Sequence, residues 1–473
     1  MNANKKPGRG DGGDGGGNPL GTERIGRLML RFAIPAIVSM LVNALYNLID
    51  QVLIGFAVGM LGIAATNIAF PLTTISTATA LLLGIGGASN YNLRLGEGDA
   101  EASRRVAGNT LSYLAIAGTV IGAVVLIFTN PLVMAFGSTE TVRPLALSYT
   151  TIIAIGVPFG IFTTGACALI RADGSPRFAM TCTLVGAIFN IVVDPIIAFV
   201  LKWGLVGLAW STTIGQMMTA AIAVYYFMAK ANNISVKRQY ITPRLSLLKV
   251  ICALGISSCI NQVAMAIIQI TMNNTLRHYG AASIYGSDIP LGSVGAIAKL
   301  NVVFVAFTVG IAQGCQPIHG FNYGAKQYDR VKKTLRLAIM AASAVSILVF
   351  CTFQLFPRQL MIIFGENDPL YLQFAERYLR IYMFMTFVNG VQPITSNFFT
   401  SIGRAKRGMW VSLTRQILFL LPLLLILPLF FGLDGVMYAG PAADFVAAGL
   451  SVALIALELQ RINALQQLHA PTV

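Results

Sequence analysis

Long runs of apolar residues, separated by short polar segments, recur along the chain from about residue 28 to residue 458. An α-helix rises about 1.5 Å per residue, so about 20 apolar residues cross the roughly 30 Å hydrocarbon core of a bilayer. The pattern therefore predicts an all-α polytopic membrane protein with twelve transmembrane helices. We expect these helices at residues 28–54, 63–92, 106–129, 142–170, 177–201, 204–229, 246–276, 292–321, 331–355, 370–402, 408–431 and 435–458.

The composition agrees with this prediction. Of the 473 residues, 56% are hydrophobic and only 11% are charged, which excludes a soluble domain with an ordinary surface. The net charge of +15 is compatible with nucleic-acid binding, but the basic residues lie in short clusters between the apolar runs and not on one continuous surface. We therefore expect the lipid bilayer, and no nucleic acid, as the surroundings of this chain.

The basic residues instead indicate the topology. If the N-terminal segment and every second loop lie on one side of the membrane, that side carries 25 basic residues and the other side carries six. Cytoplasmic loops hold the excess of Lys and Arg in membrane proteins. The distribution predicts that both termini are cytoplasmic.

Two copies of a six-helix unit are indicated by an internal repeat. The segment "ADGSPRFAM" at 172–180 resembles "SIGRAKRGM" at 401–409, and the glycine pair of "WGLVG" recurs in "FGLDG", at a similar offset along the chain. A unit with an even number of spans enters the membrane the same way each time, so the repeat is parallel. Transporters built from parallel repeats place their substrate path between the two lobes.

The repeat divides the chain into two lobes with a connecting segment. The first residues are rich in Gly and Asp, cannot bury a core, and lack the apolar segment of a signal peptide. We expect a disordered Gly-rich cytoplasmic tail at 1–22, an N-terminal lobe at 23–229, a basic cytoplasmic linker at 230–245, a C-terminal lobe at 246–462 and a cytoplasmic tail at 463–473.

Two aspartates lie where a charge is costly. Asp50 is the only charged residue between Phe32 and Leu93, and Asp194 is the only one between Arg177 and Lys202. Counted from the cytoplasmic ends of their helices, both lie about 25–28 Å deep. An Asp at the centre of a span costs about 2.5–3.5 kcal/mol on insertion scales, and such residues usually mark ion or proton sites. We expect an ion or proton site in the N-terminal lobe.

Polar residues accompany both aspartates. Asn190 lies one turn before Asp194, and Pro195 follows it, which removes a backbone donor and frees a carbonyl oxygen as a further ligand. Carboxylate, amide and hydroxyl oxygens suit Na⁺, whereas two close carboxylates also hold a proton near neutral pH. Both alternatives stay open. The polar stripe on the first helix consists of Ser39, Asn43, Asn47 and Asp50, with Tyr46 one turn before Asp50.

The second lobe lacks the same pattern. The position that matches Asp50 in depth lies near Gln269, and the position that matches Asp194 in the repeat is Leu423. Arg415 and Asp444, on consecutive expected helices, are its other candidate charges, and we expect them to form a structural ion pair because intramembrane charges usually find partners.

Motifs of common enzymes are not found in the sequence. "GFNYGAK" at 320–326 has the wrong spacing for a phosphate-binding loop, and neither H-E-x-x-H nor G-x-S-x-G occurs. The six cysteines show no C-x-x-C spacing and predict neither a disulfide framework nor a zinc site. We therefore expect a protein that is not an enzyme and has no cofactor, and no metal beyond a Na⁺ at Asp50 and Asp194.

Several stretches together resemble the multidrug and toxic compound extrusion (MATE) family, most closely its bacterial MepA-like and DinF-like members. The resemblance runs from residue 18 onward over nearly the whole chain. The matching stretches are "ALYNLIDQVLIG" (44–55), "RADGSPRFAM" (171–180), "NIVVDP" (190–195), "CQPIHGFNYGA" (315–325) and "SLTRQILFLLP" (412–422).

The resemblance implies an antiporter of the bacterial plasma membrane that exports organic cations and drugs in exchange for H⁺ or Na⁺ by alternating access. It carries a cation site onto Asp50, Asn190, Asp194, Thr212 and the neighbouring Tyr46, with Ser211 and Thr213 adjoining Thr212 as alternatives for the hydroxyl. Other branches of the family carry carboxylates in the second lobe, where this sequence has Gln269. The polar residues Asn43, Asn47, Gln269 and Gln316 are our candidates for the substrate path.

Two other transport functions and one other class fit the sequence less well. A lipid-linked oligosaccharide flippase of the same superfamily needs a positively charged cavity, but only Lys299 and Arg415 lie within spans. A major-facilitator transporter carries a G-x-x-x-D-[RK]-x-G-[RK] signature after helix 2 that this sequence lacks. A channel or receptor does not need paired acidic residues in one lobe. We expect the antiporter, acting as a monomer.

Overall fold

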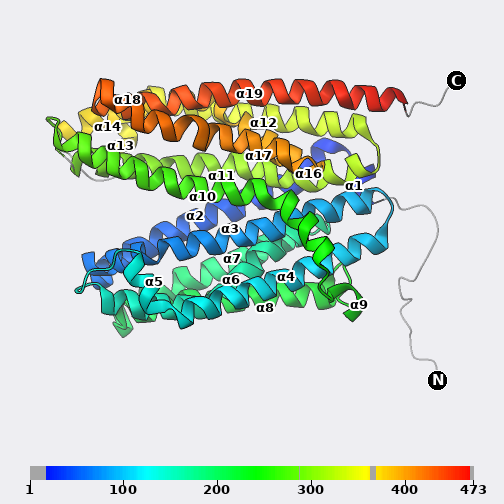
Figure 1. The fold of residues 1–473 in the computed structure, drawn as a ribbon, viewed down its shortest axis with the longest axis horizontal. Helices are drawn as coiled ribbons and strands as arrows, with labels where there is room; N and C mark the ends of the chain where they lie inside the picture. Colours follow the sequence, from blue (N-terminus) through cyan, green and yellow to red (C-terminus); the bar gives the residue numbers. More distant parts are fainter. Residues whose placement is uncertain (1–17, 287, 363–368, 469–473) are drawn as a thin grey trace.

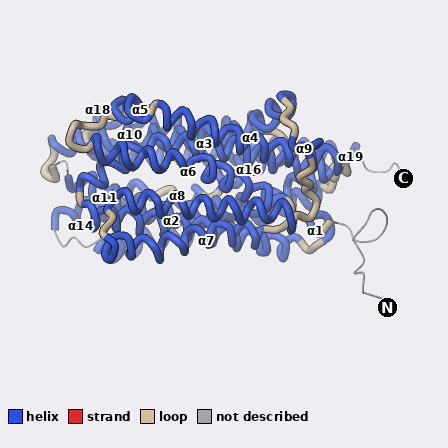
Figure 2. Tube along the Cα trace, turned by 90° about the horizontal axis from the view of Figure 1, so that it is seen from below, coloured by secondary structure: helices blue, strands red, loops and turns tan. Residues whose placement is uncertain are grey.

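The computed structural model describes residues 18–286, 288–362 and 369–468, and every regular element in them is a helix (Figure 2). Three short segments are π-helical and are labelled η. The elements are α1(Pro19–Thr22), α2(Ile25–Val58), α3(Met60–Gly96), α4(Ala100–Ile127), α5(Thr129–Ala135), α6(Arg143–Ala172), α7(Pro176–Pro195), η1(Ile196–Leu201), α8(Gly204–Tyr225), η2(Tyr226–Lys230), α9(Arg238–Ile241), α10(Leu245–Ala281), α11(Asp288–Gly324), α12(Tyr328–Leu355), α13(Pro357–Ile362), α14(Pro369–Tyr382), α15(Thr386–Asn389), α16(Val391–Ser401), α17(Ala405–Leu413), η3(Thr414–Leu420), α18(Leu421–Phe431) and α19(Leu433–Leu468).

Eleven helices in the described ranges are long and apolar enough to cross a membrane. They match eleven of the twelve predicted spans. The prediction of one continuous helix at 370–402, the remaining span, was wrong, because this part of the chain forms the three helices α14, α15 and α16. Gly390 lies between the last two helices, and Pro393 has no backbone N–H to donate one turn back, so a single regular helix is disfavoured here. The three pieces together still run the length of the molecule (Figure 1).

The helices form two bundles that lie side by side (Figure 1). The first bundle contains α2 to α8, and the second contains α10 to α19. The described ends of the chain, Asn18 and Leu468, both lie at the right of Figure 1. We call this end of the molecule the terminal end and the opposite end the distal end.

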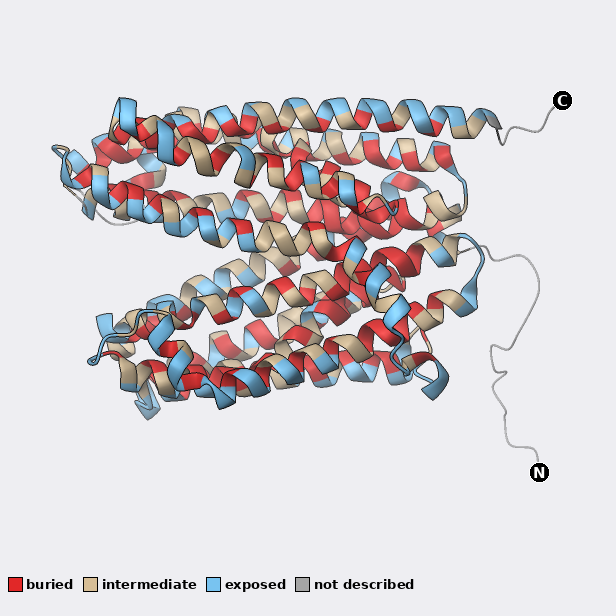
Figure 3. Cartoon of the chain, in the orientation of Figure 1, coloured by how far each residue is buried: buried red, intermediate tan, exposed pale blue. Residues whose placement is uncertain are grey.

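Exposed residues lie on the outside of both bundles (Figure 3), and many of them are large apolar residues. Phe56 is 74% exposed, Met228 is 77% exposed and Phe430 is 75% exposed. Exposed apolar surface on this scale is unfavourable in water and favourable in hydrocarbon. The outer surface is therefore the lipid-facing surface of a membrane protein.

The two bundles touch backbone to backbone in the terminal half of the molecule. A Cβ atom at Gly255 of α10 would lie 1.8 Å from the Leu82 carbonyl oxygen of α3, and one at Gly314 of α11 would lie 2.6 Å from Ala33 Cα of α2. Only glycine permits such close helix packing. The contact pairs α3 with α10 and α2 with α11, which is the pattern that a two-fold axis between parallel repeats would generate.

Candidate functional site

Two buried carboxylates lie in the distal half of the first bundle. Asp50 of α2 is 9% exposed and Asp194 of α7 is 1% exposed, and the two groups interact electrostatically. Oδ1 of Asp50 and both carboxylate oxygens of Asp194 are buried without a hydrogen-bond partner in the described part of the chain. Buried polar atoms are nearly always paired in native proteins, so three unpaired oxygens at one place indicate a site that takes a ligand from outside the chain.

Hydroxyl and amide groups from α2, α7 and α8 surround the carboxylates. Thr212 donates its hydroxyl to the Leu208 carbonyl oxygen at 3.2 Å, so it is left to accept from Tyr46, whose hydroxyl lies 3.3 Å away. Ser211 donates to Asn190 Oδ1 at 3.1 Å. These bonds hold the side chains of three helices in a fixed arrangement beside Asp50 and Asp194.

The helix that carries Asp194 changes geometry directly after it. Pro195 ends α7, and residues Ile196–Leu201 continue as the π-helical segment η1. Proline removes the hydrogen bond to the residue four positions earlier, so the Ile191 carbonyl oxygen loses its usual helical donor. π-helical turns are rare and occur frequently at functional sites. The backbone next to Asp194 can therefore supply an oxygen that a regular helix would keep occupied.

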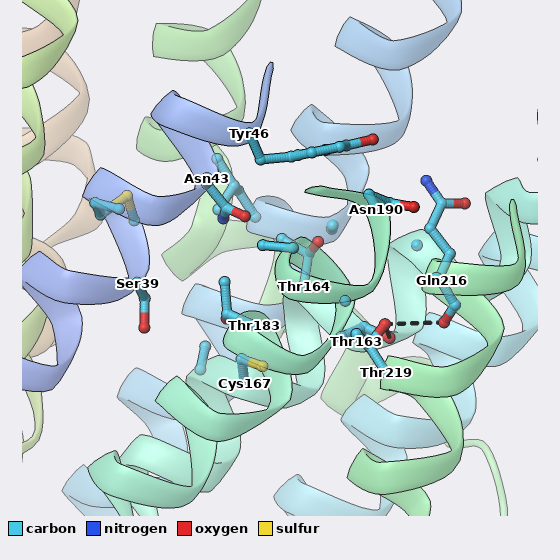
Figure 4. A pocket seen from close by; sticks show the side chains of 18 of the residues that line it. Ser39, Asn43, Tyr46, Thr163, Thr164, Cys167, Thr183, Asn190, Gln216 and Thr219 are labelled. Carbon is cyan, nitrogen blue, oxygen red and sulfur yellow. Dashed lines mark hydrogen bonds between the residues drawn. The ribbon is translucent and has the colours of Figure 1, made fainter. Parts of the chain in front are cut away.

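A cavity of about 240 Å³, lined by both polar and apolar residues, adjoins this group of residues (Figure 4). Tyr46, Asn190 and Thr212 line its distal part, and Asn43 and Gln216 lie beside them. Its lining comes from α2, α3, α6, α7 and α8, with Gln313 of α11 as a contribution from the second bundle. The cavity gives small ions and water a place next to Tyr46, Asn190 and Thr212.

The oxygen-rich site suits a monovalent hard cation or protons. Carboxylate, hydroxyl, amide and carbonyl oxygens are the ligands that hard cations prefer. No group of three or more His, Cys, Asp or Glu residues with the arrangement of a metal site occurs in the described residues, so the geometry does not resemble a zinc site. The arrangement can bind and release one or more positive charges.

The MatE family model matches two stretches of the chain, residues 35–196 and 257–426. The chain belongs to the MatE family. The two matches fall in different bundles, in agreement with the internal repeat. This assignment confirms the resemblance drawn from the sequence motifs, and with the bacterial relatives described next it supports the predicted multi-pass protein of a bacterial membrane.

Relatives and solved structures agree with the family assignment. The multidrug export protein MepA of Staphylococcus aureus (strain N315) is 23% identical over 438 residues, which cover 92% of this chain and 95% of that protein. The structure of the MATE multidrug transporter DinF-BH, solved as a complex, is similar to this chain with a TM-score of 0.84 and 34% sequence identity. The match covers 92% of this chain and 96% of the DinF-BH chain. An outward-facing MATE family transporter of the MOP superfamily is 22% identical, covers 94% and 99%, and has a TM-score of 0.86.

Two residues that the sequence analysis did not assign to the site lie beside it. Ser211 was left as an alternative to Thr212, and the hydroxyls of both residues bond to other members of the site. Tyr149 of α6 interacts electrostatically with both Asp50 and Asp194. Its depth was the available signal, because it lies six residues from the distal start of α6 and Asp50 lies eight residues from the distal end of α2.

The four candidates for the substrate path occupy different places. Asn43 lines the cavity, and Asn47 is exposed one turn away and donates to the Asn43 carbonyl oxygen at 2.7 Å. Gln269 is exposed on α10 and donates to Asn273 Oδ1 at 3.1 Å. Gln316 is buried between the bundles, where its amide donates to the Ser89 hydroxyl at 2.8 Å. Of these four residues, Asn43 is the one that lines the cavity together with Tyr46, Asn190 and Thr212.

Arg415 and Asp444 form an ion pair inside the second bundle. Nε of Arg415 lies 2.6 Å from Oδ1 of Asp444, and the Asn389 amide donates to Oδ2 at 3.1 Å. Asp444 is 6% exposed. Both carboxylate oxygens are therefore occupied by donors of the protein itself, in contrast to those of Asp194.

Proposed function

We propose that this MatE-family protein is a secondary active multidrug efflux antiporter, which exports cationic amphipathic compounds in exchange for H⁺ or Na⁺. The observation that carries the proposal is the pair of buried carboxylates, Asp50 and Asp194, with three oxygens that no donor of the described chain satisfies. The relatives that are named as multidrug transporters support drugs as the exported compounds.

We place the terminal end in the cytoplasm, because 25 basic residues gather on that side. The glycine contacts of Gly255 and Gly314 then close the cytoplasmic side of the space between the bundles. Alternating access requires that these contacts open while the distal side closes. An ion can drive that change only if it binds the two conformations with different affinity.

The carboxylate pair supplies such a difference in affinity. When Asp50 and Asp194 are both ionised they repel each other across a poorly solvated site, and a bound proton or Na⁺ relieves that repulsion. The relief is greatest where the helices α2 and α7 hold the two groups closest. Ion binding therefore favours the conformation with the tighter site, and ion release permits the other.

Transport in proteoliposomes tests this function. The purified protein is reconstituted, a proton gradient or a Na⁺ gradient is imposed separately, and ethidium movement is followed by fluorescence. We expect one of the two gradients to drive ethidium movement in the wild type. Failure of both gradients to move ethidium would overturn the antiport and favour a lipid flippase.

A further inference from the structure

The cavity beside the carboxylates extends toward the terminal end of the first bundle. In Figure 4, Tyr46 and Asn190 lie at one side of the cavity and Cys167 lies at the other. Arg171, in the last turn of α6, lines the same cavity. The cavity therefore connects the surroundings of the cation site with the end of α6 that we place at the cytoplasmic surface.

Side chains that bind water line the cavity along this direction. They include one residue with an unused acceptor, because Oε1 of Gln216 is buried without a partner among the described residues. The cavity of about 240 Å³ is large enough for several waters, each of which needs two to four polar partners. The polar lining between the two ends consists of Ser39, Thr163, Thr164, Thr183, Gln216 and Thr219 (Figure 4). In a passage that water fills, a positive charge on the wall opposes the movement of cations.

Arg171 carries a charge that no acidic side chain of the described chain neutralises within 4 Å. Asp173, the acidic residue nearest to Arg171 in the sequence, forms hydrogen bonds with other groups. Oδ1 of Asp173 accepts from the Tyr91 hydroxyl at 2.8 Å and from the backbone N–H of Asn233 at 3.0 Å. Oδ2 accepts from the Tyr226 hydroxyl at 2.8 Å and from the backbone N–H of Asn232 at 2.7 Å.

An unpaired guanidinium in a cavity is a strong local source of positive potential. Low-dielectric walls focus the field of such a charge, and arginines in membrane channels exclude cations and protons in this way. We propose that Arg171 is the electrostatic barrier that closes the ion path on the cytoplasmic side, between the cation site at Asp50 and Asp194 and the cytoplasm. This inference rests on the proposed antiport function.

The surroundings of Asp173 couple the barrier to the movement of the bundles. Asn232 and Asn233 belong to the linker between the bundles, and Asp173 holds them beside the loop that follows Arg171. The Asn232 side chain adds a hydrogen bond to the Asp173 carbonyl oxygen at 2.7 Å. A rearrangement of the bundles that pulls on the linker is therefore transmitted to the end of α6, where it displaces Arg171.

The experiment measures ion leak in the absence of drug. Full-length protein is reconstituted in liposomes, a potassium diffusion potential with negative interior is imposed with valinomycin, and entry of H⁺ and of Na⁺ is followed with internal dyes. Arg171→Gln removes the charge and Arg171→Lys keeps it. Arg177→Gln is the matched control, because Arg177 is exposed in the first turn of α7, at the same end of the bundle.

We expect Arg171→Gln to raise the leak of the coupled ion about tenfold, which corresponds to a barrier lowered by about 1.4 kcal/mol. The ion leak should stay low in the wild type, in Arg171→Lys and in Arg177→Gln. Ethidium binding by the purified Arg171→Gln variant verifies its fold, and Arg171→Met serves as a second neutral variant if the first does not fold.

The proposal would be overturned if folded Arg171→Gln or Arg171→Met leaked no more ions than the wild type. It would also be overturned if the leak of Arg171→Lys were as large as that of Arg171→Gln. These results are distinguishable from a failure of the antiport itself. In that case the wild type would show no ion-driven ethidium movement in parallel vesicles, whatever the leak of the variants.

Discussion

Both bundles bury aspartates in spanning helices, but the surroundings of Asp194 in the first bundle differ from those of Asp444 in the second. In the second bundle, Oδ1 of Asp444 accepts a hydrogen bond from Arg415 at 2.6 Å, and Oδ2 accepts one from the Asn389 amide at 3.1 Å. Both oxygens of Asp444 are therefore hydrogen-bonded. In the first bundle, Asp194 is 1% exposed and neither of its oxygens has a partner within the described ranges. A carboxylate that the protein satisfies contributes to the fold, whereas one that it leaves unsatisfied is available to an ion.

Removing one partner of the satisfied pair should have the largest effect. Arg415→Met leaves Asp444 as an uncompensated buried charge, and we expect a loss of about 3–5 kcal/mol in the free energy of unfolding. The double variant Arg415→Met/Asp444→Leu should recover most of that loss, because no charge then remains unpaired. Thermal unfolding in detergent measures both variants. A single variant as stable as the wild type would contradict the structural role of the pair.

Neutralising Asp194 should impair transport and leave the stability of the protein nearly unchanged. Asp194→Asn is expected to leave the thermal midpoint near that of the wild type, because Asn has the shape of Asp and keeps a carbonyl oxygen that accepts hydrogen bonds. Ion-driven ethidium export should fall about 100-fold, equivalent to about 2.7 kcal/mol.

Asp434→Asn is the control for that variant, since Asp434 forms a partly exposed pair with Arg377 at 2.8 Å. It should transport normally. Full ion-driven export by folded Asp194→Asn would show that the unpaired carboxylate is not the coupling group.

The first bundle can also be made to resemble the second. Thr212→Lys brings an ammonium group next to Tyr46 and Asn190, where it can neutralise the carboxylates permanently. We expect export to fall at least about tenfold with unchanged or increased thermal stability, since a resident charge competes with the ion. Thr181→Lys, on the exposed terminal half of α7, controls for the added charge. Undiminished transport by Thr212→Lys would argue against an ion site at this place.

The smallest effect should come from the Ser211 hydroxyl, which the sequence analysis left as an alternative to Thr212. Ser211→Ala removes the donor to Asn190 Oδ1 and should weaken the apparent affinity for the coupling ion about fivefold, or about 1 kcal/mol. Maximal export at saturating ion concentration should stay close to that of the wild type. The dependence of the export rate on ion concentration measures this, and an unchanged half-saturating concentration would exclude Ser211 from the site.

Most of the fold could be predicted, because each membrane span corresponds to a long apolar run in the sequence. The exception was residues 370–402, where Gly390 and Pro393 interrupt a run that is apolar enough on average to suggest one helix. Hydropathy reports how apolar a segment is and carries little information about breaks within it. The predicted side of the membrane for the termini stays a prediction.

The site could be predicted only in part, for a geometric reason. Asp50 and Asp194 stand out because a lone charge in a span is visible in the sequence. Tyr149 is one of 15 tyrosines, and its approach to both carboxylates depends on how α6 packs. The unpaired state of Arg171 was hidden as well, because Asp173 two residues later looks like its partner until the four donors to Asp173 are known.

The coupling between drug and ion at Asp194 is tested most directly by running the exchange in reverse. An ethidium gradient is imposed across proteoliposomes without any ion gradient, and movement of H⁺ or Na⁺ in the opposite direction is recorded with internal dyes. The proposed coupling predicts opposite ion movement in the wild type and in Arg415→Met/Asp444→Leu, and none in Asp194→Asn. Ethidium movement without ion movement in the wild type, or ion movement that persists in Asp194→Asn, would contradict it.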